Sequence, residues 1–277
     1  CNFHCCFCQN WFSSQALRDP AAADAVHSIR QIPADRLVQY ALDNGALGVA
    51  SSYNEPLITS EWAVEVFKLA KTHGLRTAYV SNGFATPEGL DYLAPWLDGY
   101  KVDLKSMRDS AYRKMGGRLQ PVLDTIRRVK ELGLWLEVVT LVIPGMNDST
   151  EELWEAGRFL SSISTDIPWH VTAYHPDYKE DAPPTPAETL QRAADIGQEA
   201  GLRYVYAGNL PGRVGSLEDT LCPRCGKGLI LRRGYRLIGY HITDTGTCEF
   251  CGNPIAGVWQ TGTGHHSGHG LPRRVSY

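Results

Sequence analysis

The sequence has no cysteine from Gln9 to Leu221, although it contains eight cysteines in all. They form two groups, one within the first eight residues and one between positions 222 and 251. A secreted domain held by disulfides is small and spreads its cysteines through the fold, so this distribution argues against that class. Close-spaced groups in a large chain favour bound metal and a reducing cytoplasm.

Other absences narrow the function classes. No apolar run approaches the roughly 18–20 residues of a membrane span, and no signal-peptide pattern precedes Cys1. The net charge is −3, so no general basic field predicts nucleic-acid binding. A local basic run at Arg232, Arg233 and Arg236 is interpreted as the solvated face of a hairpin. We therefore expect a cytoplasmic protein with no membrane or nucleic-acid partner.

The central part of the chain alternates strand-like and helix-like segments, which predicts an α/β fold with a parallel sheet. The length of 277 residues allows one large core and a small appendage. The apolar, β-branched runs that predict strands are 46–53, 76–81, 99–104, 135–143, 169–174 and 203–207. The amphipathic runs that predict helices are 33–44, 60–73, 87–96, 121–132, 150–161 and 187–200.

Polar or turn-forming residues follow nearly every predicted strand. They occupy 52–56, 81–83, 103–105, 144–148 and 174–176. Six parallel strands suit either an open doubly wound sheet or a partial barrel. In both folds, ligands gather at the carboxyl ends of the strands. The sequence therefore predicts a site at that edge.

The first cysteine group contains a C-x3-C-x2-C pattern formed by Cys1, Cys5 and Cys8, with Cys6 outside the register. Three thiolates on one tight loop suit an iron–sulfur cubane with one iron left open to hold a substrate. The alternative is a zinc site, which would need a fourth ligand that the pattern does not provide.

This spacing, with the aromatic Phe7 directly before the last cysteine, resembles the signature of the radical S-adenosylmethionine (SAM) superfamily. The segments CNFHCCFCQNW, SYNEP, SNGF, DGYKVDLKS, LVIPGMND and YHPDYK together resemble the radical SAM enzyme of the AmmeMemoRadiSam system. That group is similar to pyruvate formate-lyase activating enzymes. The resemblance extends over roughly Cys1 to Trp259.

The resemblance implies two cofactors, a [4Fe–4S] cluster on Cys1, Cys5 and Cys8 and SAM bound at the fourth iron. Glu55 would accept from the methionyl ammonium group, and Lys105 would pair with the methionyl carboxylate. The family carries two glycines where this chain has Tyr53 and Asn54. Ser81 and Asn82 would contact the ribose or the methionine moiety, and Asp103 would help to bind a cation or the ligand. Val142 would lie near the adenine or ribose, and His175 near the adenine. Phe7 and Asn54 are further implied cofactor-binding residues.

The resemblance also implies the fold and its divisions. We expect a partial (β/α)6 TIM-like barrel over 1–212, a four-cysteine metal-binding ribbon over 213–260 and a flexible tail over 261–277. In this superfamily the cysteine loop follows the first strand, so we expect that strand upstream of Cys1.

The second cysteine group is a pair of C-x2-C-G knuckles, formed by Cys222 with Cys225 and by Cys248 with Cys251. The knuckles flank a predicted hairpin over 229–242. Four thiolates at this spacing predict a single tetrahedral metal ion. Structural zinc is the favoured interpretation, and the alternative is a rubredoxin-like iron that relays electrons to the first cluster.

The predicted activity is reductive cleavage of SAM to a 5′-deoxyadenosyl radical, which takes hydrogen from an unidentified small molecule or protein. The electron donor would be a flavodoxin or ferredoxin. One alternative is an activating enzyme that installs a glycyl radical on a partner protein. Against it, Val139 stands where those enzymes are expected to carry an arginine. The other alternative is an iron–sulfur electron-transfer or zinc-binding scaffold.

Overall fold

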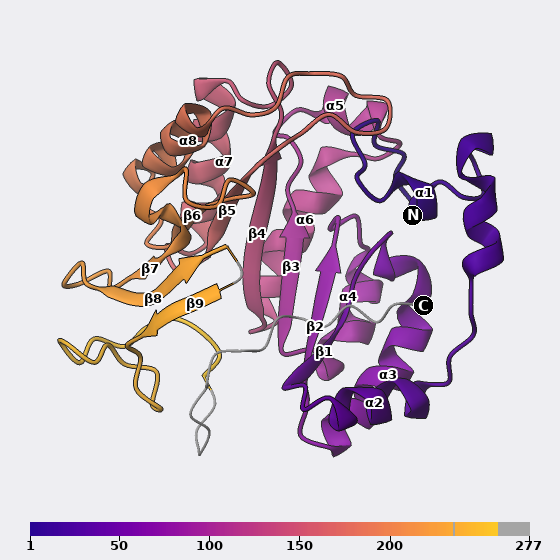
Figure 1. Ribbon diagram of the computed structural model, residues 1–277, viewed down its shortest axis with the longest axis horizontal. Coiled ribbons are helices and arrows are strands. Elements are labelled where there is room, and N and C mark those ends of the chain that lie inside the picture. The colour runs from indigo at the N-terminus through magenta and orange to yellow at the C-terminus, as the bar shows by residue number, and fades with distance from the viewer. Residues whose placement is uncertain (235, 260–277) are drawn as a thin grey trace. The chain divides into compact units, whose positions relative to one another are not determined.

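The computed structural model describes residues 1–234 and 236–259 (Figure 1). These residues fall into two compact units. The first contains Cys1–Glu137 and Pro176–Asp181, and the second contains Val138–His175 and the described residues from Ala182 on. The predicted flexible tail lies outside the described residues, and the predicted domain boundaries stay predictions. No helix in the described ranges is long and apolar enough to cross a membrane.

Six strands form one sheet in the order in which they occur along the chain, and the four pairings β1–β2, β2–β3, β4–β5 and β5–β6 are parallel. This arrangement confirms the predicted α/β class with the strand order of a partial barrel. The strands are β1 (Gly48–Ser51), β2 (Arg76–Ser81), β3 (Gly99–Asp103), β4 (Trp135–Val142), β5 (Trp169–Ala173) and β6 (Val205–Gly208).

The six long helices form where the sequence predicts them. Two of them begin at a capping side chain: Thr86 Oγ1 accepts from the Gly89 amide at 3.2 Å, and Ser149 Oγ accepts from the Glu152 amide at 3.2 Å. The helices are α2 (Ala34–Asp43), α3 (Ser60–Thr72), α4 (Pro87–Leu93), α6 (Leu119–Glu131), α7 (Thr150–Ile163) and α8 (Ala187–Glu199).

Two predicted elements are shorter in the structure by more than their end residues. The first strand ends at Ser51, and Tyr53 and Asn54 adopt left-handed backbone angles with φ of 64° and 51°. The fourth predicted helix ends as α-helix at Leu93 and continues as the 3-10 turn η3 (Ala94–Trp96), because Pro95 has no amide hydrogen to continue the α-helical pattern. Short elements without clear periodicity were not predicted: α1 (Trp11–Ser14), η1 (Pro20–Ser28), η2 (Pro56–Thr59), α5 (Asp109–Lys114) and η4 (Gly215–Glu218).

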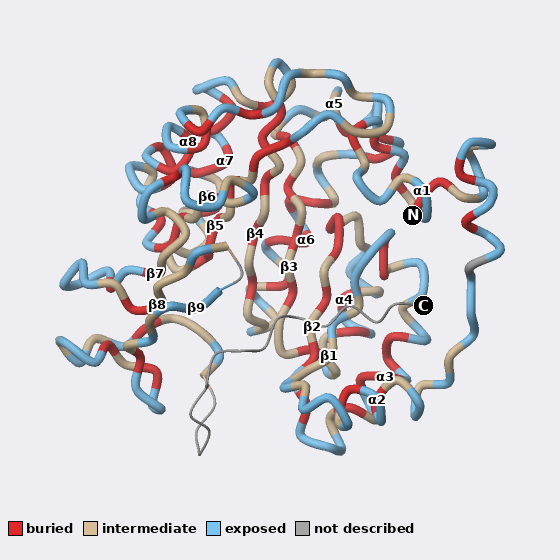
Figure 2. Tube along the Cα trace, viewed as in Figure 1, coloured by how far each residue is buried: buried red, intermediate tan, exposed pale blue. Residues whose placement is uncertain are grey.

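The core of the first unit forms where alternate residues of β2 and β3 are buried (Figure 2). Tyr79 of β2 lies between Phe67 of α3 and Tyr100 of β3, with ring centroids 6.2 Å and 5.4 Å away. All three side chains are at most 2% exposed. This aromatic layer fixes the strands whose ends carry the predicted site.

The core of the second unit is built around Trp169 of β5, which is fully buried. Its indole N–H donates to Thr140 Oγ1 of β4 at 3.0 Å. A Cβ at Gly197 of α8 would lie 2.8 Å from this ring, so the helix approaches the strand closely only because position 197 has no side chain.

A second, antiparallel sheet follows β6 and contains β7 (Thr220–Leu221), β8 (Gly228–Arg233) and β9 (Arg236–Tyr240). Strands β8 and β9 confirm the predicted hairpin. The buried cluster under this sheet is small, and two of its six members are predicted metal ligands: Tyr204, Cys222, Leu229, Ile242, Cys248 and Ile255. We call the segment 220–256 the ribbon.

Candidate active site

The first cysteine group lies on a loop that is anchored to the first unit by its aromatic residues. Phe3 is 1% exposed and packs against Phe84 and Tyr112, with ring centroids 5.3 Å and 6.0 Å away. Phe7 is also buried. We call residues 1–10 the cysteine loop. Since its two phenylalanines point into the core, the chain between them is held in a fixed path.

The cysteines of this loop differ in exposure. Cys5 is buried, Cys1 and Cys8 are half-buried, and Cys6 is exposed. Burial raises the pKa of the Cys5 thiol to about 11, although nearby Lys105 acts in the opposite direction. A bound metal would remove this proton, because a coordinating thiol is deprotonated outright.

The donor set of the cysteine loop suits an iron–sulfur cluster. Cys1, Cys5 and Cys8 offer three thiols on one loop, and cysteine thiolates are the ligands that hold such clusters. The group identified among the described residues as close enough for a single metal ion is a different one, Cys222, Cys225, Cys248 and Cys251. By their chemistry, the residues of the cysteine loop fit a [4Fe–4S] cluster.

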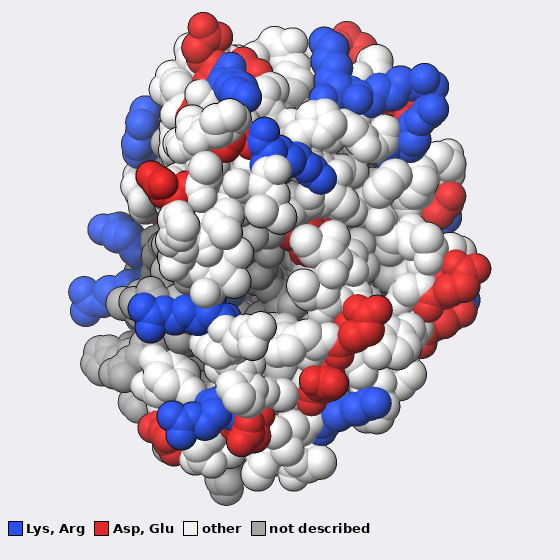
Figure 3. All heavy atoms as spheres, turned by 90° about the vertical axis from the view of Figure 1, so that its right-hand side faces the viewer, with Lys and Arg blue, Asp and Glu red and all other residues white. Residues whose placement is uncertain are grey.

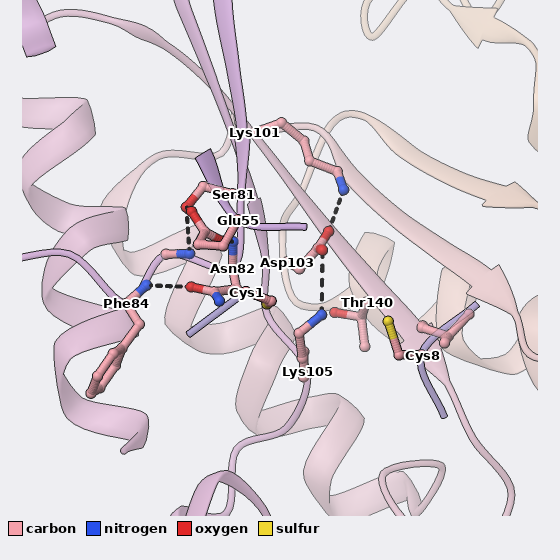
Figure 4. A network of polar contacts seen from close by, with 12 residues as sticks. Cys1, Cys8, Glu55, Ser81, Asn82, Phe84, Lys101, Asp103, Lys105 and Thr140 are labelled. Carbon is pink, nitrogen blue, oxygen red and sulfur yellow. Dashed lines mark hydrogen bonds and ion pairs between the residues drawn. The ribbon is translucent and has the colours of Figure 1, made fainter. Parts of the chain in front are cut away.

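Glu55 lies directly after β1 and is 1% exposed. Its Oε1 accepts from Ser81 Oγ at 2.7 Å and from the Leu57 amide at 3.1 Å, and its Oε2 accepts from the Asn82 amide at 2.7 Å (Figure 4). Burial raises the pKa of this carboxyl group, while these donors oppose the shift. The three hydrogen bonds tie the ends of β1 and β2 together around one carboxylate.

Asn82 connects this carboxylate network to the cysteine loop. Its Nδ2 donates to Asn2 Oδ1 at 2.7 Å, and its Oδ1 accepts from the Phe84 amide at 3.0 Å. The structure therefore brings three predicted site residues, Glu55, Ser81 and Asn82, into one network that ends on the cysteine loop. Asn2 was not predicted.

Tyr53 and Asn54 adopt left-handed backbone angles at the two positions where the family resemblance implies glycines. Non-glycine residues in this conformation cost of the order of 1–3 kcal/mol each. Asn54 is held there by Ser13, whose Oγ donates to its Oδ1 at 3.0 Å. The chain therefore follows a backbone path that glycine adopts without strain.

Asp103, at the end of β3, lies between two lysines. Lys101 donates to its Oδ1, and Lys105 Nζ lies 3.3 Å from its Oδ2 (Figure 4). Burial would raise the pKa of Asp103, but Lys105 and Lys101 bring it down to about 2. The sequence analysis missed Lys101, although the alternation K-x-D-x-K places it on the same face of β3 as Asp103.

A segment far along the chain, 176–181, also contacts the cysteine loop, and we call it the strap. The Lys179 amide donates to the Cys6 carbonyl at 2.9 Å. Cys6 Sγ donates to Glu180 Oε2 at 3.3 Å. The Tyr178 ring stacks on Trp11 at 5.2 Å and an interplanar angle of 10°. No role was predicted for residues 176–181.

The strap is fastened by Asp19, at the start of η1. Lys179 Nζ lies 2.7 Å from Asp19 Oδ2, which also accepts from the Tyr178 hydroxyl. These two donors lower the pKa of Asp19 to about 2. The strap therefore contacts the cysteine loop at Cys6 and is itself held by the stacking of Tyr178 on Trp11 and by the ion pair between Lys179 and Asp19.

Removing the Tyr178 ring should loosen the cysteine loop. A stacked aromatic pair contributes about 1 kcal/mol beyond its buried area, and 1.4 kcal/mol is a factor of ten. We expect Tyr178→Ala to release cluster iron to a chelator about fivefold faster than wild type under anaerobic conditions. Tyr178→Phe keeps the ring and should accelerate release less. Equal release rates for Tyr178→Ala and wild type would contradict a holding role for the strap.

Two predicted site residues belong to the second unit. Val142, at the end of β4, is fully buried, and its carbonyl accepts from Thr185 Oγ1 at 2.6 Å. His175 is exposed just after β5. Their contacts with adenine stay predictions, as do the cofactor contacts of the residues in the first unit.

The second cysteine group forms a compact four-thiol site in the second unit. Cys222, Cys225, Cys248 and Cys251 have their sulfurs within 4.8 Å of one another, with 3.7 Å from Cys222 to Cys251 and 3.8 Å from Cys225 to Cys248. A tetrahedral ion with metal–sulfur bonds of about 2.3 Å places sulfurs about 3.8 Å apart. The site therefore fits one tetrahedral ion.

The knuckle backbone favours thiolate at this site. Burial would raise the pKa of Cys222, but the amides of Cys225 and Arg224 point at its sulfur and lower the pKa to about 7. Gly226 and Gly252 follow the knuckles with φ of 71° and 69°, a conformation that glycine adopts without strain.

Comparison with known proteins agrees with this geometry. The chain is 34% identical to the uncharacterized protein MJ0808 of Methanocaldococcus jannaschii over 92% of this chain and 74% of that protein. It is 23% identical to the pyruvate formate-lyase-activating enzyme of Staphylococcus epidermidis over 76% of this chain and 88% of the relative.

Solved structures support the same fold. A domain of a pyruvate-formate lyase-activating enzyme from Bacteroides vulgatus matches with a TM-score of 0.53 and 24% identity, over 58% of this chain and 99% of that one. Streptococcus suis SuiB matches with a TM-score of 0.58 and 17% identity, over 76% and 47%. The sequence model described as the radical SAM superfamily matches residues 1–160. With three thiols on one loop and a polar network leading from it to the strand ends, this chain belongs to the radical SAM superfamily.

Proposed function

We propose that Cys1, Cys5 and Cys8 hold a [4Fe–4S] cluster and that the strand ends of the first unit hold SAM. When both are bound, the cluster supplies the electron that splits SAM into methionine and a 5′-deoxyadenosyl radical, which abstracts hydrogen from a substrate. The observation that supports this proposal is the difference in exposure among four neighbouring cysteines: Cys5 is buried and Cys1 and Cys8 are half-buried, whereas Cys6 is exposed and its thiol donates to Glu180.

Glu55 is proposed to bind the methionyl ammonium group. A carboxylate offers about four acceptor positions, and three are used by Ser81, Leu57 and Asn82. One position remains for a cationic N–H donor, and the three bonds prevent the carboxylate from turning away. Its burial strengthens the attraction, because the local dielectric constant is low.

Lys105 is proposed to bind the methionyl carboxylate. Lys101, Asp103 and Lys105 together carry a net charge of +1, two ammonium groups and one carboxylate, which suits an anionic group. Both oxygens of Asp103 contact lysines, so its proposed role is to orient Lys105 rather than to bind a metal cation. The further residues proposed to contact the cofactors are Phe7, Asn54, Ser81, Asn82, Val142 and His175.

The four-thiol site of the ribbon is proposed to hold structural zinc, since closed four-thiolate knuckles are the usual structural zinc site. A rubredoxin-like iron fits the same sulfur spacing, and metal analysis of anaerobically purified protein separates the two. The eight free thiols suit a reducing compartment such as the cytoplasm. The motifs quoted in the sequence analysis support placing the chain with the AmmeMemoRadiSam radical enzymes.

A second candidate is an activating enzyme that installs a glycyl radical on a partner protein. The relatives named as pyruvate formate-lyase-activating enzymes favour it. Val139, where those enzymes are expected to carry an arginine, weighs against it. We therefore propose hydrogen abstraction from a small molecule or a protein as the general activity.

Incubating the cluster-loaded protein with SAM and dithionite tests the activity. We expect 5′-deoxyadenosine and methionine in equal amounts. No 5′-deoxyadenosine from protein with a full [4Fe–4S] content would contradict the proposal and favour a scaffold. A lasting radical signal on an added partner protein would favour the activating enzyme.

A further inference from the structure

A cluster of exposed basic side chains lies on and beside α5. Arg108, Arg113, Lys114 and Arg118 are exposed, and Asp109 is the acidic residue between them. Four cations and one carboxylate give this patch a charge of +3, against −3 for the whole chain. Lys and Arg atoms gather along the upper part of the face in Figure 3. We call these four cations the basic patch.

The basic patch adjoins the cysteine loop. The His4 amide donates to the Met115 carbonyl at 3.0 Å, directly after Lys114. A Cβ at Gly116 would lie 2.4 Å from the His4 ring, and one at Gly117 would lie 2.4 Å from the Phe3 ring. Glycines at both positions thus allow the loop that carries the patch to lie against the cysteine loop.

The cysteine loop itself adds no opposing charge. The sequence from Cys1 to Arg18 contains no aspartate or glutamate. His4, Cys6, Gln9 and Asn10 are exposed on this loop. Glu180 of the strap is an acidic side chain that contacts this loop, at Cys6, whereas the segment that carries the basic patch contacts it at His4. A protein that docks on the basic patch would therefore reach the cysteine loop from its His4 side.

We propose that the basic patch docks an acidic one-electron carrier protein, with a reduced flavin or iron–sulfur group, that reduces the cluster on the cysteine loop. The carrier loses one electron and the cluster gains it, so no further reactant is needed. This inference rests on the proposed function, which requires a reduced cluster. Charge complementarity across such a contact raises the association rate by about 10- to 1,000-fold at low salt.

Nucleic acid is the other polyanion that a basic patch can attract, but the surroundings favour a protein. Single-stranded nucleic acid binds through aromatic stacking as well as charge. The aromatic side chain of α5, Tyr112, is fully buried. The patch also lies beside the group that must receive an electron, which only a redox carrier supplies.

The test compares two reductants at low ionic strength. In the triple variant Arg108→Gln, Lys114→Gln, Arg118→Gln, we expect 5′-deoxyadenosine formation with reduced flavodoxin to fall about tenfold, because steering depends on the removed charges. Formation with dithionite, a small reductant, should match wild type. The difference in flavodoxin-supported rate between wild type and the triple variant should decrease as the salt concentration rises, because dissolved ions screen the charges of the contact. Arg113 is left unchanged, because its Nε forms an ion pair with Asp109 Oδ2 at 2.7 Å.

Two matched variants make the test specific. Arg30→Gln with Arg36→Gln removes exposed charges before and on α2, and should leave the flavodoxin-supported rate unchanged. Arg108→Lys, Lys114→Arg, Arg118→Lys keeps the charges and should keep the rate.

An unchanged flavodoxin-supported rate in the glutamine triple variant would overturn the docking proposal. An equal loss of that rate in the triple variant and in the Arg30→Gln, Arg36→Gln variant would overturn it as well. The same holds if the triple variant lost only affinity for single-stranded nucleic acid. Failure of wild type with dithionite would instead count against the proposed function.

Discussion

Cys5→Ala is expected to abolish both cluster binding and 5′-deoxyadenosine formation. Cys5 is the most buried thiol of the cysteine loop, so no water-exposed group can replace it as a ligand without moving the loop. Iron and sulfide should fall to background after anaerobic reconstitution, and SAM should remain uncleaved with dithionite. The measurements are iron and sulfide content, visible absorption and product analysis.

Cys6→Ala is the matched control, since it removes the neighbouring thiol. Cys6 is exposed and donates to Glu180, so its loss should leave a full cluster and turnover near wild type. Circular dichroism establishes that both variants fold. If Cys5→Ala kept its cluster, or if Cys6→Ala lost it, the assignment of the three ligands would be wrong.

Local sequence patterns were sufficient to predict the sheet and the six long helices. Strands β2 and β3 follow runs of β-branched and aromatic residues, and the cap at Thr86 acts within one helical turn. The polar strand ends were also predictable, because parallel strands deliver their carboxyl ends to one edge. Glu55 and Asn82 share a hydrogen bond for this reason.

Contacts between distant segments were not predictable in the same way. The strap contacts the cysteine loop through the Lys179 amide and the neighbouring helix α1 through the Tyr178 ring, and neither contact has a periodic signal in the sequence. The left-handed turn at Tyr53 and Asn54 was not predicted, because a tyrosine gives no signal for this backbone conformation and an asparagine gives a weaker one than glycine. Such features depend on tertiary packing, which overrides local preference.

Cys248→Ser is expected to remove the ribbon metal and unfold the ribbon. Two of the six residues in its buried cluster are cysteines of the proposed metal site, so little apolar surface remains to hold the ribbon together. Structural zinc contributes about 10–16 kcal/mol to the folding of small zinc-binding peptides, far more than this cluster can replace. Amide hydrogen exchange over 220–256 should rise towards the unfolded rate, and one equivalent of metal should be lost.

His241→Gln provides the comparison for this variant. His241 Nδ1 lies 2.9 Å from Glu249 Oε2, beside the knuckle but outside the four-thiol site. Its replacement should leave both the metal content and hydrogen exchange of the ribbon unchanged. Slow exchange in metal-free Cys248→Ser would show that apolar packing alone holds the ribbon, and would refute the structural role of the metal. Because the cysteine loop, where the cluster is proposed to bind, belongs to the other unit, we expect the ribbon to unfold while the [4Fe–4S] content is retained.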